Sequence, residues 1–337
     1  MKKQILKTIY NFGGFAPFHW ANRGNLGVLM YHRFSRAADE YKISADEFAA
    51  HLEYLSKHAL VLSLSEAIET LENNGQLPPN AVVITIDDGY ADSFDIAFPL
   101  LRKFRMPATI YAVTDFLDGK CWLWTDLMRF VLTNTVIENV RIEFADGDTI
   151  ETKLNGKQSR LETANRINAR LKKMSNELKT SKIAEFAQIL KVEIPATPTG
   201  DYAPISWEQA RAMDAGNVQI ESHTVTHPIL TNISQNELDT ELQTSKARLE
   251  TQLNKSVRHF CYPNGILDES VEKAVRRAGY SSAATTEYGF NAEQMNRFAL
   301  KRFDAPAAIE NFAQTASGFE ALRSRLKIEI TSRTEKN

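Results

Sequence analysis

Two short segments of the sequence carry residue types that suit catalysis. Asp87 and Asp88 stand side by side where an apolar run, 81–86, ends before a glycine, and His223 and His227 lie four residues apart after a short alternating run. One carboxylate and two imidazoles can bind a divalent metal ion and leave positions open for water and substrate. The second carboxylate is then free to act as a base, which indicates metal-assisted hydrolysis.

Each segment has a simpler explanation when it is taken alone. An Asp-Asp-Gly triplet is commonly a turn or a helix cap, and a His-x₃-His spacing is commonly a solvated helix face, where the two rings point the same way. Position is the stronger argument, because ligands of parallel α/β folds bind beyond the carboxyl ends of the strands. The residues expected at or just past strand ends are His32, Asp87, Asp88, His223, Tyr262 and Arg302.

The elements that must position these residues alternate between strand and helix in the first and last thirds of the chain. This alternation is typical of a parallel sheet or barrel. The expected strands cover 26–31, 81–86, 108–113, 218–221, 257–262, 281–285 and 299–303. The expected helices cover 44–58, with Ser44 as N-cap and Glu47 completing a capping box, and then 65–73, 91–104, 207–215, 237–253 and 268–278.

The middle of the chain breaks the alternation. Residues 122–204 contain a hairpin pattern and then a charged helical stretch at 159–190. We interpret them as an insertion rather than an independent domain, because the alternation resumes at Ser206. Residues 1–25 are expected to form an N-terminal helical segment and residues 26–330 the main domain, with a frayed tail after Ile328.

Composition narrows the class of function. The chain has 40 basic and 42 acidic residues, a formal net charge of −2, so no basic excess indicates a nucleic-acid partner. Two cysteines are too few for a disulfide framework and fit a reducing compartment, although a bridge between Cys121 and Cys261 stays open. Neither a secretory signal nor a membrane-spanning run is expected. We expect a cytoplasmic protein, whose aromatic residues between 5 and 20 either pack on the core or contact the inner membrane surface peripherally.

Segments 85–89 (TIDDG) and 223–228 (HTVTHP) resemble two motifs of the polysaccharide deacetylase family, which comprises the NodB homology domain and carbohydrate esterase family 4. The resemblance runs from about 27 to 303, and the insertion is less well matched. It implies an α/β fold, a distorted (β/α) barrel of the NodB type, that removes acyl groups, usually N-acetyl, from sugars. It further implies Asp87 as base, and Asp88, His223 and His227 as ligands of one divalent metal ion. Zn²⁺ is the expected ion, with Co²⁺ or Ni²⁺ as alternatives.

Two other motifs depart from the commonest pattern of this family. The third motif usually carries an arginine that orients the base, but the aligned stretch 261–264 reads Cys-Tyr-Pro-Asn. Arg302, at the end of the last expected strand, is our candidate to supply that cation. The late Leu-x-His that provides the general acid reads Leu-Lys-Arg at 300–302, so that histidine is absent too.

A branch of the family that deacetylates poly-N-acetylglucosamine begins with a Tyr-His motif, which Tyr31 and His32 resemble, and segment 260–265 resembles its third motif. The likeness implies His32 as the acid that protonates the leaving amine. The alternative is a hydrogen-bonded core histidine.

Substrate contacts are expected from aromatic and loop residues around this site. Backbone N–H groups near Tyr262 are expected to help hold the oxyanion, and Trp124 either stacks on a sugar or packs in the core. The residues expected to contact substrate are Tyr90, Tyr262, Pro263, Asn264 and Trp124.

The predicted function is therefore metal-dependent deacetylation of an N-acetylated sugar, in a polysaccharide or in its lipid- or nucleotide-linked precursor. Two alternatives stay open, hydrolysis of another acyl or cyclic amide bond in the same fold and a catalytically degenerate carbohydrate-binding protein. Nothing in the sequence indicates an oligomeric state.

Overall fold

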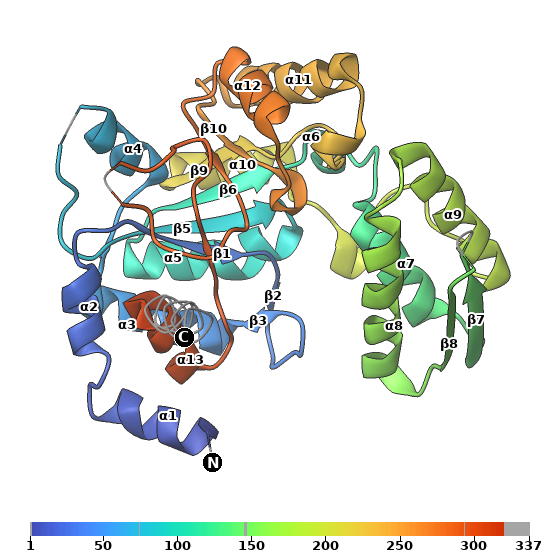
Figure 1. The fold of residues 1–337 in the computed structure, drawn as a ribbon, viewed down its shortest axis with the longest axis horizontal. Helices are drawn as coiled ribbons and strands as arrows, with labels where there is room; N and C mark the ends of the chain where they lie inside the picture. Colours follow the sequence, from blue (N-terminus) through green and yellow to red (C-terminus); the bar gives the residue numbers. More distant parts are fainter. Residues whose placement is uncertain (1, 74, 145–146, 293, 320–337) are drawn as a thin grey trace, which may run out of the picture.

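The computed structural model describes residues 2–73, 75–144, 147–292 and 294–319 of the chain. The predicted domain end at 330 and the predicted frayed tail lie outside these residues. An eight-stranded sheet forms the centre of the fold (Figure 1), and every strand pair in it is parallel. Along the sheet the order is β11, β10, β9, β6, β5, β1 and β12, with β4 beside β5. The predicted α/β fold, a distorted (β/α) barrel, is confirmed.

The strands and helices follow the predicted alternation closely. The strands of the main sheet are β1 (Gly27–Tyr31), β4 (Leu60–Val61), β5 (Ala81–Asp88), β6 (Ala108–Ala112), β9 (Val218–Ser222), β10 (His259–Cys261), β11 (Ser282–Ala284) and β12 (Phe303–Asp304). The helices around it are α3 (Ala45–His58), α4 (Leu64–Glu72), α5 (Phe98–Phe104), α6 (Thr114–Leu117), α10 (Trp207–Ala215), α11 (Gln235–Leu253), α12 (Glu269–Arg277) and α13 (Ile309–Ser317). A short pair, β2 (Phe34–Ser35) and β3 (Ile43–Ser44), precedes α3.

Local sequence signals explain where these elements begin. The predicted capping box of α3 is confirmed, because the Ser44 side chain accepts from the Glu47 N–H and the Glu47 side chain accepts from Ser44. All eight residues of β5 are buried, as expected for a strand covered on both faces. The expected helix at 91–104 is interrupted, since a π-helical turn (Ser93–Ala97) precedes α5.

The sheet closes irregularly between its two outer strands. The predicted strand at 299–303 is too long: only β12 pairs with β1, and Leu300 makes an isolated parallel bridge with Ala284. The Thr285 N–H donates to Leu300 O at 2.9 Å, and the Arg302 N–H donates to Glu287 O at 2.8 Å. Backbone bonds from the chain after β11 therefore replace the regular ladder just before β12.

The insertion forms a lobe beside the sheet (Figure 1). It has its own cluster of buried apolar side chains, which Ile229 of the main domain joins. The expected hairpin is confirmed as an antiparallel pair, whereas the charged stretch at 159–190 is two helices, because Ser175 caps the second one. The elements are α7 (Trp124–Asn134), β7 (Asn139–Glu143), β8 (Thr149–Lys153), α8 (Gly156–Leu171) and α9 (Asn176–Ile189).

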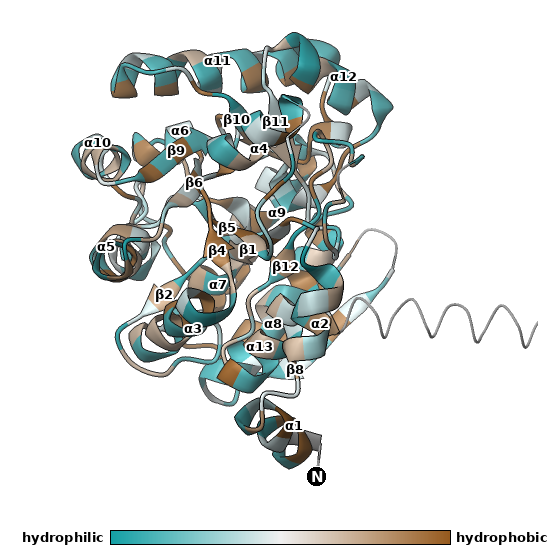
Figure 2. Ribbon diagram, turned by 90° about the vertical axis from the view of Figure 1, so that its left-hand side faces the viewer, coloured by the Kyte–Doolittle hydropathy of each residue, from teal (hydrophilic) through white to brown (hydrophobic). Residues whose placement is uncertain are grey.

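Two helices at the N-terminus, α1 (Lys2–Asn11) and α2 (Ala16–Asn22), lie against α13 at the edge of the molecule (Figures 1 and 2). Phe15 is buried in the main core, whereas Phe12 and Trp20 are 86% and 68% exposed. Packing on the core is thus confirmed for Phe15, while the contact of the exposed residues with a membrane stays a prediction. No helix among the described residues has the length and apolar character to cross a bilayer.

Candidate active site

The predicted metal ligands meet at the carboxyl end of the sheet. Asp88 ends β5, and His223 and His227 follow β9. Nε2 of each imidazole lies 3.6 Å from Asp88 Oδ1, and all three side chains are buried. Two donors on one tetrahedral ion, each bonded at about 2.0–2.2 Å, are separated by roughly 3.3–3.6 Å. The spacing of this group therefore fits one small divalent ion.

The protonation of these groups also fits a cation. Burial, and then the charge of Asp87, raises the pKa of Asp88 well above its usual value. Burial lowers the pKa of His223 to about 4 and that of His227 well below its usual value. Neutral imidazoles are the form that binds a metal ion, and a bound cation would offset the cost of ionising the buried Asp88 carboxyl.

The loop that carries the histidines is held by side chains and is not helical. Thr224 and His227 have φ angles of +73° and +59°, so the helical turn considered for this segment does not form. The Glu241 carboxylate accepts from the Val225 and Thr226 N–H groups at 2.6 and 3.0 Å. The two rings thus converge through loop geometry.

Hydrogen bonds also orient the ligands themselves. His223 Nδ1 lies 2.7 Å from the Cys261 carbonyl, which requires the N–H form at that nitrogen and leaves the Nε2 lone pair directed toward Asp88. Both cysteines are free thiols. Gly89, after Asp88 with its φ of +77°, has φ +90°, and a Cβ on Gly89 would stand 3.0 Å from Leu117 Cδ1. The turn after β5 therefore favours glycine at this position.

Asp87 is bound by Arg302 through two parallel hydrogen bonds. The Arg302 Nη1 and Nη2 atoms each donate at 2.7 Å, to Asp87 Oδ1 and Oδ2 respectively. Burial alone would raise the pKa of Asp87, but the Arg302 guanidinium holds it well below its usual range. Asp87 is therefore a carboxylate at neutral pH. Arg302 therefore supplies to Asp87, from the end of the sheet, the positive charge that the third motif lacks.

His32 lies on the open side of Asp87. Its Nε2 is 3.7 Å from Asp87 Oδ2, and its side chain is 45% exposed. Burial by the surrounding protein lowers the pKa of His32, and the charge of the Asp87 carboxylate opposes that shift. The position differs from that of a core histidine, because the ring faces the cleft. By contrast, His51 and His259 are buried and hydrogen-bonded in the core.

A cleft of about 330 Å³ opens over these groups. Tyr90, Tyr262 and Asn264 line it, as expected, while Pro263 is buried beneath the same turn. The Tyr262 N–H donates to Ala284 O at 3.0 Å, so it is not free to bind an oxyanion. Trp124 does not line the cleft: it is 9% exposed within the apolar cluster of the insertion, and Lys179 Nζ lies 4.4 Å from its ring centroid.

Sequence reasoning missed several residues of this cleft. Its lining also includes Arg33, Tyr41, Thr125, Arg129 and Thr286. The Arg33 guanidinium stacks 3.9 Å over the Tyr90 ring, and the Tyr90 hydroxyl donates to Asp126 Oδ2 at 2.6 Å. Asp126 and Arg129 belong to α7, so the insertion forms one wall. Only the proximity of Arg33 to His32 in the sequence could have indicated any of them.

Comparison with known proteins shows that the chain around this cleft matches one protein family. The model of a family described as polysaccharide deacetylase matches residues 74–283, more than half of the chain. YxkH of Bacillus subtilis, named after that family, is 22% identical over 278 residues, which cover 82% of this chain and 70% of that protein. The poly-β-1,6-N-acetyl-D-glucosamine N-deacetylase of Staphylococcus epidermidis is 33% identical over 86 residues, only 25% of this chain and 29% of that enzyme.

Solved structures share the fold. The deacetylase PplD of Streptococcus pyogenes, determined in complex with acetate, superposes with a TM-score of 0.59 at 19% identity, covering 87% of this chain and 99% of that one. IcaB from Ammonifex degensii gives a TM-score of 0.56 at 18% identity, covering 87% and 97%. Both similarities extend over nearly the whole described chain.

Proposed function

The chain belongs to the polysaccharide deacetylase family, and from that premise we propose that it removes N-acetyl groups from a sugar with the help of one divalent metal ion. The observation that carries the proposal is the convergence of Asp88, His223 and His227 beside an ionised Asp87. Two imidazoles and one carboxylate favour Zn²⁺, with Co²⁺ or Ni²⁺ as alternatives. When bound, such an ion polarises a carbonyl group and lowers the pKa of water.

The side chains around the ligands have distinct parts in this reaction. Asp87 takes a proton from the attacking water, and Arg302 keeps that carboxylate ionised and fixed in orientation. His32, 3.7 Å from Asp87 and open to the cleft, gives a proton to the leaving amine. A lowered pKa makes protonated His32 a stronger acid but reduces the protonated fraction at neutral pH, so activity should decline on the alkaline side.

Acetate release from N-acetylglucosamine oligomers tests the proposal. We expect a chelator to abolish release and Zn²⁺ or Co²⁺ to restore it. Asp87→Asn should lower kcat by at least 100-fold while the metal content stays at one per chain, whereas His227→Ala should lose the metal. A purified chain that takes up no metal, or an Asp87→Asn protein with full activity, would contradict the proposed function.

The alternative of a degenerate carbohydrate-binding protein rested on the missing arginine and the missing late histidine. Arg302 supplies a cation to Asp87 from the segment just before β12, and His32 offers an acid just after β1. No distance in the cleft favours a cyclic amide or an O-acyl ester over an N-acetyl group. Release of acetate from an O-acetylated sugar but from no N-acetylated one would favour the ester.

We further propose that the protein acts in the cytoplasm at the inner membrane surface, on a carrier-linked precursor. The first 32 residues contain four basic and no acidic residues, namely Lys2, Lys3, Lys7 and Arg23. Ile5, Phe12 and Trp20 are 54%, 86% and 68% exposed in the same segment. Basic and aromatic residues together favour binding to anionic lipid, at about 1 kcal/mol per basic residue near the surface.

Co-sedimentation with vesicles tests the membrane contact. The protein should sediment with phosphatidylglycerol vesicles at low salt and not with phosphatidylcholine vesicles. Phe12→Ser with Trp20→Ser should weaken binding, whereas Val136→Ser, at an 85% exposed position of the insertion, should not. Equal recovery with both lipids, or none with either, would contradict the contact. Cell fractionation tests the compartment, and a protein found only outside the cell would rule it out.

A further inference from the structure

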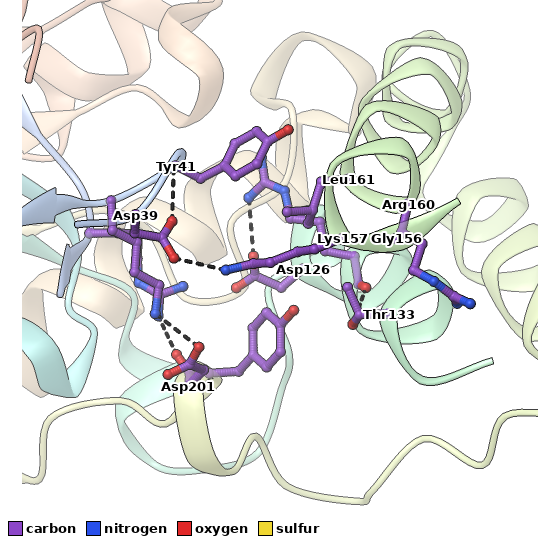
Figure 3. Close-up of a pocket in the computed structure, with 13 residues that line it drawn as sticks. Asp39, Tyr41, Asp126, Thr133, Gly156, Lys157, Arg160, Leu161 and Asp201 are labelled. Carbon is purple, nitrogen blue, oxygen red and sulfur yellow. Dashed lines mark hydrogen bonds and ion pairs between the residues drawn. The ribbon is translucent and has the colours of Figure 1, made fainter. Parts of the chain in front are cut away.

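A second cavity, of about 500 Å³, lies between the insertion and the main domain (Figure 3). Helices α7 and α8 and the 3₁₀ turn Gly200–Tyr202 line it from the insertion, and the loop at 36–42 lines it from the main domain. Its lining shares Arg33, Tyr41 and Arg129 with the catalytic cleft. The two spaces therefore adjoin, and its volume is in the range of about 300–1,000 Å³ that small-molecule sites occupy.

Most of the charges that line this cavity are paired. Figure 3 shows Lys157 reaching from α8 toward Asp39, with Nζ and Oδ2 2.8 Å apart. Arg160 donates to the carbonyl oxygens of Leu132 and Thr135. The other pairs are Arg33 with Asp92 (2.8 Å), Lys42 with Asp201 (3.0 Å) and Arg129 with Asp126 (3.3 Å). Four of the five lining cations thus have a carboxylate partner, whereas Arg160 bonds carbonyl oxygens and has no counter-charge among these pairs.

Matched ionic pairs present hydrogen-bond donors and acceptors next to one another. Vicinal hydroxyl groups have the same alternation, since each can donate to a carboxylate and accept from an ammonium or guanidinium group. A ligand with several hydroxyls therefore suits these pairs. The large exposed fraction of Lys157, 66%, leaves its remaining N–H bonds free to reach such a ligand.

Aromatic rings supply the apolar part of the same lining. Tyr41 is 41% exposed, and its ring stands at the edge of the cavity (Figure 3). Tyr202 also lines the cavity, and its ring is supported from behind by Trp122 and Phe130, with centroids 5.3 and 6.0 Å away. Ring faces of this kind cover the C–H faces of a pyranose while its hydroxyls meet polar groups. This combination indicates a carbohydrate.

We propose that this cavity binds a second sugar unit, linked to the one whose acetyl group lies in the catalytic cleft. The insertion is then a substrate-recognition element, and the enzyme prefers linked sugars over a single one. The proposal rests on the proposed function for its choice of N-acetylated carbohydrate. Its geometry rests on the cavity and on the three side chains that both spaces share.

Calorimetric binding to the metal-loaded, full-length Asp87→Asn protein tests the inference without turnover. The probes are N-acetylglucosamine and its β-1,6-linked disaccharide and tetrasaccharide. We expect at least a tenfold gain in affinity from one sugar to two. Lys157→Ala and Tyr202→Ala, each added to that protein, should remove most of the gain. Lys182→Ala is the matched control, because Lys182 is also an insertion lysine paired with a carboxylate, Glu185 at 2.6 Å, and does not line the cavity.

The outcomes separate this inference from the proposed function. Affinity that is independent of chain length, or a gain that survives both substitutions, overturns the inference even if the unsubstituted protein releases acetate. A gain lost in either variant and kept in the control supports it, even if no acetate release is found. If a thermal scan shows that the Tyr202→Ala protein is unfolded at the assay temperature, the Lys157→Ala protein alone tests the inference, because the Lys157 side chain is exposed and its loss should not unfold the protein.

Discussion

Arg302 is the side chain whose removal should disturb both stability and chemistry most. It is fully buried, and its guanidinium donates to Asp87 twice, to Thr85 Oγ1 at 3.1 Å and to the Thr285 carbonyl at 2.7 Å. Arg302→Met keeps much of the volume and removes the charge. The Asp87 carboxylate, 3% exposed, is then left buried without a cation.

The expected loss follows from the buried state of the pair. Removing one partner of a buried ion pair costs about 3–5 kcal/mol, because the remaining charge has lost its solvation and its counter-charge. We therefore expect Arg302→Met to lower the free energy of unfolding by about 3–5 kcal/mol in urea titrations. Arg276→Met is the matched control: its bonds to Glu272, at 2.7 and 3.0 Å, are exposed, so it should cost less than about 1 kcal/mol.

A double-mutant cycle isolates the interaction between the two side chains. Asp87→Asn combined with Arg302→Met should be more stable than the sum of the two single losses predicts, by about 2 kcal/mol or more. Arg302→Lys, which keeps the charge but not the two parallel bonds, should fold and should release acetate at least 100-fold more slowly. Additive losses in the cycle, or full activity in a folded Arg302→Lys protein, would refute the role given to this arginine.

Three other predictions concern the supports of the site and of the core. Glu241→Ala should weaken metal binding by about 10–100-fold in a chelator competition, because this carboxylate accepts the N–H groups that hold the ligand loop, whereas the exposed Gln243→Ala on the same helix should not. Gly89→Ala should lower activity and cost more stability than Gly279→Ala, since both have positive φ but only at the first would a Cβ meet a neighbour. Burial lowers the pKa of His51 from 6.5 to about 4, so the unfolded chain binds more protons between these values and stability falls as pH drops from about 6.5 to 4. His51→Gln should reduce that loss, measured by urea titration at pH 7 and pH 4, by up to about 3 kcal/mol.

The sequence was informative where chemistry coincides with a local signal. β5 is an apolar run that ends at Asp-Asp-Gly, and β9 ends directly before the histidines, so the strand ends and the metal ligands could be read from short windows. The capping box at Ser44 is a four-residue pattern with a local cause. Each of these features depends on residues close together in the chain.

The remainder depends on contacts between distant segments. Val225 and Thr226 adopt a loop because Glu241, on the following helix, accepts their N–H groups. Trp124 begins a helix and turns into the apolar cluster of the insertion, although its sequence neighbours suited a strand equally well. Tyr41 and Arg129 line the same cleft although they lie far apart in the chain, and no hydrophobic periodicity of the sequence indicates that their segments meet. Tertiary packing decided these features, and single-sequence patterns do not record it.

The irregular closure of the sheet has a direct consequence for the base. Arg302 reaches Asp87 from just before β12, where a regular ladder is replaced by bonds from Thr285 and Glu287. Its Nε also donates to the Thr285 carbonyl at 2.7 Å, so the backbone that closes the barrel sets the direction of the guanidinium. An arginine in the third motif would reach the base without this closure. Because the cation is Arg302 instead, the orientation of Asp87 depends on how the chain after β11 bonds to the chain before β12. Thr285→Pro, which removes the N–H that bonds Leu300, should therefore reduce acetate release beyond any loss of stability, and unchanged kcat in the folded variant would show that the closure and the base are independent.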